Sequence, residues 1–256
     1  MLSLAGKTVL LTGASKGIGA EIAATLAAAD ANVIAHYGSD RAGAEQATAI
    51  FAPERVLLIG ADLKDRSAVD RLWNEALAWR GRVDVVVNNA AVMRIAGGVE
   101  DDEKAWDEVW DEALKVNVLA PVRLMRHAVR HYLQAGGGIL VTISSWAAQR
   151  GPGNPALIAY SASKGAVLSA TKTIARNYAS KNILAYVVAP GVVRTRLSEQ
   201  AAAAAAGGEA AFTAGLAMGE WVPPSDIGNL VAFLATGACR HLTGATLDVN
   251  GASYIR

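Results

Sequence analysis

Short apolar runs rich in β-branched residues alternate with helical stretches along the whole chain. The runs are bounded by turn residues and lie at 8–12, 32–37, 56–61, 83–88, 139–144, 183–189 and 245–249. Helical patterns fall between them at 18–29, 67–79, 106–133, 160–178 and 226–234. Strands that are apolar throughout are buried on both faces, and parallel strands need long crossovers. The alternation therefore predicts an α/β fold, a doubly wound parallel sheet of about seven strands with helices on both faces.

Composition favours a single domain over residues 1–256, because α/β chains of this length commonly form one core. Only 18% of the residues are charged while 52% are hydrophobic, which suggests that other subunits cover part of the surface. A formal charge of +1 supplies no field for nucleic acid or an anionic membrane, and we expect neither partner.

Nothing in the sequence predicts secretion or a membrane span. The first residues lack the basic and apolar regions of a signal peptide, and no apolar stretch reaches ~18 residues. The single cysteine, Cys239, cannot form an intrachain disulfide. His127 and His131 are spaced like a metal pair but stand among arginines, so no metal site is expected. We expect a cytoplasmic protein.

The segment 194–222 interrupts the alternation. Six consecutive alanines end at Ala206 and are followed by Gly207 and Gly208, a composition that predicts a short helix and then a flexible break. Two interpretations remain open for this segment, a substrate lid and a low-complexity surface insertion.

A glycine-rich turn follows the first predicted strand and opens the first predicted helix. Glycines at such a turn let the backbone approach a pyrophosphate, and the helix N-terminus offers free N–H groups. The residues expected to bind a dinucleotide here are Gly13, Ser15, Lys16, Gly17, Ile18 and Gly19. Their spacing is GxxxGxG rather than GxGxxG.

The end of the second predicted strand bears on the choice between NAD and NADP. NAD-selective proteins place a carboxylate there, whereas this chain has Tyr37. Lys16, Ser39 and Arg41 offer donors to a 2′-phosphate, although Asp40 could neutralise Arg41. We therefore predict NADP(H), with NAD less favoured.

Tyr160 and Lys164 are four residues apart and share one helix face. A free tyrosine has a pKa of about 10, so exchanging protons near neutral pH requires a neighbouring cation. Lys164 would supply that charge.

The ordered motifs resemble those of the short-chain dehydrogenase/reductase family over essentially the whole chain. They are Thr12-Gly13 to Gly19, Asp62-Leu63, Asn88 to Ala91, Asn117, Ser144-Ser145, Tyr160 to Lys164 and Pro190-Gly191 to Thr195. The resemblance implies a Rossmann-like sheet and hydride transfer between a nicotinamide and a ketone or secondary alcohol. Among relatives, the chain resembles the β-ketoacyl carrier-protein reductases.

The resemblance also implies roles for individual residues. Tyr160 would be the general acid or base, and Lys164 would lower its pKa and hold the nicotinamide ribose. Ser145 would bind the substrate oxygen, and Asn117 would hold a water that relays protons. Asp62 would contact adenine, Asn89 would line the cofactor groove and Thr195 would hold the carboxamide. The implied cofactor site is completed by Leu63, Ala90, Pro190, Gly191 and Val193.

Two features depart from the family pattern. Ser145 precedes Tyr160 by 15 residues, a longer interval than is common, so either Ser144 or Ser145 could face the substrate; we favour Ser145. Ala91 stands where glycine commonly ends the asparagine motif.

Bulky side chains are expected near the substrate. Met93, Arg94, Trp146 and Trp221 follow predicted strand ends and would form pocket walls, although packing explains each of them nearly as well. The expected substrates are 3-oxoacyl thioesters, sugars and cyclic ketones.

Relatives in this family also suggest partners. Arginines near 123–130 and at Arg176 would meet an acyl carrier protein, with a solvated basic face as the alternative. Relatives form homotetramers through the helices that here carry Asn117 and Tyr160. A non-catalytic dinucleotide-binding sensor or scaffold is the rival function. Such proteins typically lose the tyrosine or the lysine, and both are present in this chain.

Overall fold

A parallel seven-stranded sheet with the order β3-β2-β1-β4-β5-β6-β7 forms the centre of the computed structural model, which describes residues 2–204 and 207–256. The strands are β1 (Thr8–Leu11), β2 (Asn32–Tyr37), β3 (Val56–Gly60), β4 (Val85–Asn88), β5 (Gly138–Ile143), β6 (Ile183–Pro190) and β7 (Thr246–Val249). All seven predicted strands are confirmed. The order reverses between β1 and β4, where Leu10 pairs with both Ile34 and Val86. A crevice for a ligand forms at such a reversal, beyond the carboxyl ends of the strands.

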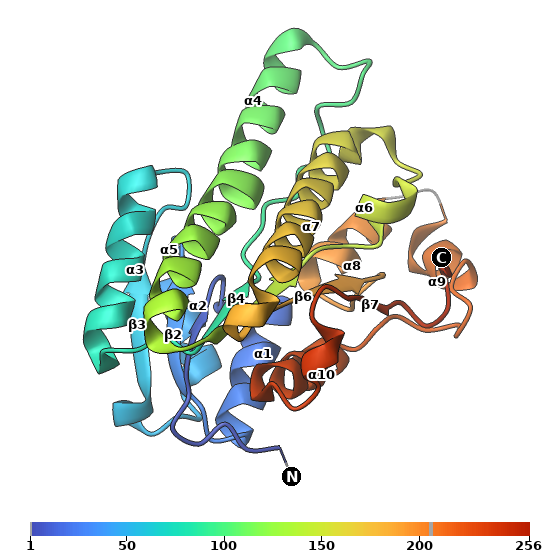
Figure 1. Cartoon of the computed structure of the whole chain (residues 1–256). Coiled ribbons are helices and arrows are strands. Elements are labelled where there is room, and N and C mark those ends of the chain that lie inside the picture. The colour runs from blue at the N-terminus through green and yellow to red at the C-terminus, as the bar shows by residue number, and fades with distance from the viewer. Residues whose placement is uncertain (1, 205–206) are drawn as a thin grey trace.

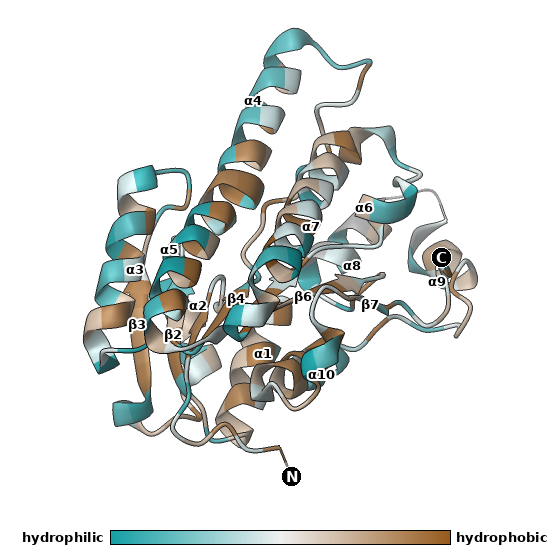
Figure 2. Ribbon diagram, viewed as in Figure 1, coloured by the Kyte–Doolittle hydropathy of each residue, from teal (hydrophilic) through white to brown (hydrophobic). Residues whose placement is uncertain are grey.

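Helices cover both faces of this sheet (Figure 1). One face packs on α1 (Gly17–Ala28) and α10 (Pro224–Thr236), and the other on α3 (Arg66–Arg80), α5 (Ala120–Ala135) and α7 (Ile158–Tyr178). Successive strand residues supply the two cores in turn, as Val85 and Val87 do for one and Val86 for the other. Figure 2 shows the strands as largely apolar, which is the pattern that made them predictable.

The long helix predicted at 106–133 is divided into three parts. α4 (Glu103–Ala113) continues into a π-helical turn at Leu114–Leu119 and then into α5. In Figure 1, α4 extends beyond the rest of the molecule, and Figure 2 shows a polar tip. Such π turns widen the helix locally and are frequent at functional sites. Asn117 lies within this turn.

The remaining helices were not predicted or were only outlined. α2 (Arg41–Thr48) is capped by Asp40, whose carboxylate accepts from Gly43 N at 2.9 Å. Short helices also form at α6 (Ala147–Arg150) and at the 3₁₀ turns Pro53–Arg55, Pro155–Leu157, Ala179–Lys181 and Arg240–Leu242.

The alanine-rich segment forms α8 (Arg196–Ala204), followed by α9 (Gly208–Ala214). Gly207, the N-cap of α9, and Gly208, its first residue, have φ values of 82° and 59°. Ala205 and Ala206, part of the predicted lid, lie outside the described residues. Within 2–204 and 207–256, no helix combines the length and apolarity that crossing a bilayer would require.

Candidate active site

The glycine turn joins β1 to α1 through a path that larger residues would block. Gly17 has a φ of 55°, and a Cβ built on Gly19 would lie 1.9 Å from the Gly13 carbonyl oxygen. Lys16, the N-cap residue of α1, makes no side-chain hydrogen bond to the first N–H groups of this helix, which leaves these donors for a ligand. Backbone donors at a helix N-terminus suit the phosphates of a dinucleotide. The predicted turn residues therefore fit such a ligand.

The residues after β4 hold this turn from one side. Asn89 Nδ2 donates to the carbonyl oxygens of Thr12 and Gly13 at 2.9 and 3.0 Å. Thr12 Oγ1 accepts from Asn89 N and Ala90 N at 3.0 and 3.1 Å. The predicted groove residues Asn89 and Ala90 thus lie directly against the glycine turn. Their contacts fix the turn relative to β4.

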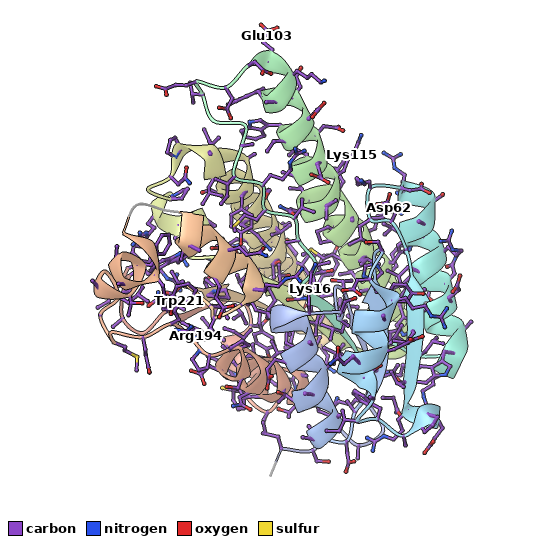
Figure 3. The ribbon with its side chains drawn as sticks, turned by 180° about the vertical axis from the view of Figure 1, so that it is seen from behind. Lys16, Asp62, Glu103, Lys115, Arg194 and Trp221 are labelled. Carbon is purple, nitrogen blue, oxygen red and sulfur yellow. The ribbon has the colours of Figure 1, made fainter. Side chains whose placement is uncertain are left out.

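At the end of β2, the charges are paired differently from the expectation that Asp40 could neutralise Arg41. Arg41 Nε lies 2.8 Å from Glu45 Oε1, and both side chains are largely exposed. Asp40 caps α2 instead, and Ser15 Oγ donates to its main-chain oxygen at 2.7 Å. Lys16, labelled near the start of α1 in Figure 3, is exposed like Ser39. A 2′-phosphate would therefore meet cations with two exposed carboxylates beside them, those of Asp40 and Glu45.

The turn after β3 holds the predicted adenine contact. Asp62 is exposed and its Oδ1 accepts from Lys64 N at 2.9 Å, while Leu63 is buried in the core. This hydrogen bond from Lys64 N holds the Asp62 carboxylate in place just after the end of β3. The neighbouring Tyr37 ring packs against Gly60, where an added Cβ would lie 3.0 Å from it.

Tyr160, Lys164 and Ser145 meet where β5 and the first turns of α7 come together. Lys164 Nζ lies 5.8 Å from the centroid of the Tyr160 ring and donates to the Ile143 carbonyl oxygen at 2.8 Å. The Ser145 hydroxyl lies on the Tyr160 side of the site, where it lowers the pKa of the Tyr160 phenol. The structure therefore brings together the three residues that the sequence placed at the chemical centre.

Burial controls the ionisation of this pair. It raises the pKa of the Tyr160 phenol, and the Ser145 hydroxyl opposes that rise. Burial also lowers the pKa of the Lys164 ammonium to about 8. The resemblance implies that Lys164 lowers the pKa of Tyr160; in the structure, burial is the largest influence on that pKa and raises it. A protonated phenol at neutral pH can donate a proton to a carbonyl oxygen.

The two adjacent serines have different surroundings. Ser144 Oγ donates to the main-chain oxygen of Lys164 at 2.9 Å. Ser145 Oγ accepts from Ala147 N at 3.1 Å and contacts the Tyr160 side chain. Ser145 therefore lies on the Tyr160 side, as favoured from the sequence, whereas Ser144 joins β5 to α7.

Asn117 is buried with both side-chain ends engaged. Its Oδ1 accepts from Val92 N at 2.8 Å, and its Nδ2 donates to Val92 O at 2.9 Å and Ser163 Oγ at 3.0 Å. Ser163 Oγ in turn donates to Tyr160 O at 2.7 Å. Sequence reasoning gave Ser163 no role. Its place inside the Tyr160–Lys164 motif was the available signal.

The segment after β6 approaches the glycine turn. A Cβ on Gly17 would lie 3.3 Å from Thr195 Cγ2, so Thr195 borders the helix N-terminus. Gly191, which follows Pro190, is backed closely by Asn250. Val193 pairs with Val222 in a single parallel bridge, which joins the two ends of the predicted lid.

The predicted substrate walls are unequal in exposure. Trp146 is half-buried, and the Arg150 guanidinium lies 4.3 Å from its ring centroid. Trp221 is 3% exposed, and its Nε1 donates to Thr213 Oγ1 at 2.9 Å. Figure 3 shows Trp221 beside Arg194, whose guanidinium lies 4.9 Å from the ring centroid. Trp221 thus packs within the lid segment and presents little surface of its own.

Arg94 lies on the loop after β4. Its Nη1 is 3.7 Å from Glu112 Oε2, and about half of its side chain is exposed. No group of three or more His, Cys, Asp or Glu side chains suited to a metal ion occurs among the described residues.

Comparison with known proteins gives consistent relatives. Residues 13–252 match the family profile described as enoyl-(acyl carrier protein) reductase. The chain is 32% identical to 3-oxoacyl-(acyl-carrier-protein) reductase of Escherichia coli (strain K12), over 99% of this chain and 100% of the relative. It is 33% identical to 3beta-hydroxysteroid dehydrogenase 1 of Eggerthella lenta, over 97% of this chain and 94% of the relative. A crystal structure of a short chain dehydrogenase from Burkholderia cenocepacia J2315 in complex with NADP matches with a TM-score of 0.87 and 33% identity, covering 98% of each chain.

Proposed function

The chain belongs to the short-chain dehydrogenase/reductase family, and on this premise we propose that it is an NADP-dependent oxidoreductase that interconverts a ketone and a secondary alcohol. The observation that carries the proposal is the meeting of Tyr160, Ser145 and Lys164 at the carboxyl edge of the sheet that also holds the glycine turn. A nucleotide site and a proton donor at one sheet edge suit hydride transfer coupled to proton transfer.

The residues present fit NADP. When bound, the reduced cofactor supplies the hydride that adds to the carbonyl carbon. Backbone N–H groups at the start of α1 would hold the pyrophosphate, and the absence of a carboxylate at Tyr37 favours a 2′-phosphate. Lys16, Ser39 and Arg41 would donate to that phosphate. Asp62, Leu63, Asn89 and Ala90 would line the adenine and groove side; Pro190, Gly191, Val193 and Thr195 would line the nicotinamide side.

Tyr160 donates a proton to the substrate oxygen during reduction and accepts one during oxidation. The raised pKa keeps the phenol protonated at neutral pH, the form that donates a proton during reduction. Ser145 holds the substrate oxygen by a hydrogen bond, and Lys164 binds the ribose hydroxyls. The side-chain amide of Asn117 is engaged by Val92 and Ser163, so its main-chain oxygen is the group that would bind a relaying water.

Residues 1–256 form one domain. The substrate enters between the loop after β4 and the 194–222 segment, which acts as a lid over the active site. Trp146 and Arg94 contribute to the pocket wall. Trp221 anchors the lid through Thr213 rather than lining an open surface. A 3-oxoacyl thioester, a sugar or a cyclic ketone is the proposed substrate class.

Loss of NADPH absorbance across a panel of these three classes tests the proposal. We expect turnover of at least one class, with NADPH preferred over NADH. Tight NADPH binding without turnover of any carbonyl would favour a non-catalytic sensor instead. Tighter binding of NADH than NADPH would refute the cofactor assignment.

An acyl carrier protein is the partner proposed for a thioester substrate. Arg126, Arg130 and Arg176 are exposed and form no ion pair in the described part of the chain, whereas Arg123 pairs with Asp70. An acidic carrier would bind this face. Faster reduction of a carrier-bound thioester than of the free thioester, lost at high salt, is the expected result; equal rates would exclude the partner.

We further propose a cytoplasmic homotetramer. Leu114, Leu119 and Val122 are 42%, 58% and 37% exposed along the π turn and the start of α5, an apolar face that subunit contact would cover. Light scattering should report four subunits, and a monomer would contradict the assembly. The free, exposed Cys239 is consistent with a reducing compartment, which cell fractionation can test.

A further inference from the structure

His36 lies inside β2 and is only 2% exposed. Its Nδ1 accepts from Gly13 N at 3.1 Å, and its main-chain oxygen accepts from Ala14 N at 2.9 Å. The side chain and the backbone of one residue therefore bind two successive N–H groups of the glycine turn. The proposed mechanism gives His36 no role.

The other edge of the imidazole fixes its tautomer. Nε2 lies 3.0 Å from the carbonyl oxygen of Ala61, which follows β3. A carbonyl oxygen only accepts, so Nε2 carries the proton and Nδ1 has a lone pair for the Gly13 N–H. The neutral ring thus connects the end of β3 to the glycine turn.

On its opposite side the turn has no free space. A Cβ built on Gly13 would lie 2.9 Å from Ala90 Cα, so Gly13 is enclosed between the His36 ring and the residue after Asn89. Loss of the ring acceptor would leave the Gly13 N–H without a partner and release the turn on one side.

We propose that His36 is a positioning residue for the dinucleotide, and that its neutral imidazole holds the glycine turn where the N–H groups of α1 meet the pyrophosphate. This inference rests on the proposed function. His36 does not touch the ligand; it acts through Gly13.

Protonation would end this role, because a charged imidazole has two N–H donors and no acceptor. Burial lowers the pKa of His36, and the Ala61 carbonyl opposes that effect. The titratable residues close in sequence to His36 and its bonding partners are Lys16 in the turn, Tyr37 on β2 and Asp62 after Ala61; Lys16 and Asp62 are exposed. Acid should therefore weaken the turn, and neutral pH should preserve it.

Three variants separate the two hydrogen bonds. Asn at position 36 can place Oδ1 near the Nδ1 site, Gln can place its amide nearer the Nε2 site, and Leu offers neither. We expect His36→Leu and His36→Gln to weaken NADPH binding roughly tenfold in fluorescence titration, and His36→Asn to restore most of it. The binding of NADH should weaken by the same factor, because the turn holds the pyrophosphate that both cofactors share.

The acid dependence gives a second readout. The ratio of the NADPH dissociation constants of His36→Leu and wild type should fall toward one only as the pH drops below 6.5, because burial lowers the pKa of His36 and the wild type keeps its acceptor above that pH. The titration of the cofactor phosphate cancels in this ratio. Equal NADPH affinity of His36→Leu and wild type, or His36→Asn binding as weakly as His36→Leu, would overturn the proposal.

Nitrogen NMR of the wild-type protein without cofactor tests the tautomer independently of any variant's folding. We expect a protonated Nε2 and an unprotonated Nδ1 at neutral pH, and the reverse assignment would also overturn the proposal. Failure of the wild type to bind either dinucleotide would instead reject the proposed function. The tautomer result would then still stand as a test of the geometry.

Discussion

The glycine turn and the lid segment lie on the same edge of the sheet but are held in place by different means. The turn is fixed through its main-chain groups: His36 binds the N–H groups of Gly13 and Ala14 on one side, and the Asn89 side chain binds the carbonyl oxygens of Thr12 and Gly13 on the other. The lid is joined at its ends by one bridge between Val193 and Val222, and side-chain contacts hold it elsewhere.

Within the lid, Arg194 lies near Glu199 and Glu209 in pairs that are about half exposed, and Trp221 bonds to Thr213. Exposed ion pairs contribute little stability. The cofactor region is therefore built to stay fixed, whereas the substrate region can rearrange at small cost.

The largest expected effect separates chemistry from binding. Tyr160→Phe removes the proton-donating oxygen and should lower kcat by roughly three orders of magnitude or more. The NADPH dissociation constant should stay near the wild-type value, because the turn is untouched. Steady-state kinetics and fluorescence titration measure the two quantities; retained turnover would refute the role of Tyr160.

Lys164 gives a pH test of the catalytic side. Its pKa is about 8 in the folded protein against 10.5 for the free side chain, so the unfolded chain binds more protons between these values. The free energy of unfolding should therefore rise with pH across that window, by up to about 3 kcal/mol. Urea unfolding of wild type and Lys164→Met should show this rise only in the wild type. Parallel pH profiles of the two proteins would contradict the assignment.

Gly19→Ala tests the fixed region. The added Cβ would lie 1.9 Å from the Gly13 carbonyl oxygen, so the turn must move. Overpacking of this kind costs roughly 1–3 kcal/mol, and NADPH binding should weaken by about tenfold to a hundredfold. Gly153→Ala is the matched control, since nothing lies within 4 Å of its Cβ. Equal NADPH affinity in both variants would show that the turn is less constrained than its contacts indicate.

Thr213→Val tests the movable region. It removes the acceptor of the Trp221 indole N–H, worth about 1 kcal/mol. We expect a severalfold higher substrate KM and faster proteolysis within 194–222, with NADPH binding unchanged. Thr213→Ser keeps the hydroxyl and should behave like the wild type. A change in NADPH affinity would contradict the separation of the two regions.

The smallest effects concern the end of β2. Arg41→Ala should weaken NADPH binding severalfold and leave NADH binding unchanged, because only NADPH carries the 2′-phosphate. Glu45→Gln should tighten NADPH binding by about twofold, since the exposed pair competes weakly for the guanidinium. Equal effects on both cofactors would reject Arg41 as a selectivity residue.

Sequence predicted the strands well because burial on both faces leaves an unmistakable apolar run, as at Val85–Asn88. It missed the π turn at Leu114–Leu119, because the apolar spacing there also fits a regular helix. Helix α2 escaped prediction because only Ala44 and Thr48 are buried on it. Contacts between residues far apart in the sequence could not be predicted either.

The site shows the same division. The proximity of Tyr160 and Lys164 could be predicted from the sequence, because one helix carries both residues four positions apart. The contact between His36 and Gly13 depends on the pairing of β1 with β2, which no local pattern specifies. The Gly43 N–H likewise donates to the Asp40 carboxylate, so Asp40 caps α2 while Arg41 pairs with Glu45 instead.

The strand order also has a consequence for biosynthesis. β1, β2 and β3 are consecutive in the chain and lie side by side, while β4 joins the other edge of β1. During synthesis the first three strands leave the ribosome before β4, so His36 is released ahead of Asn89. The two supports of the glycine turn therefore become available at different times, the one on the adenine side first.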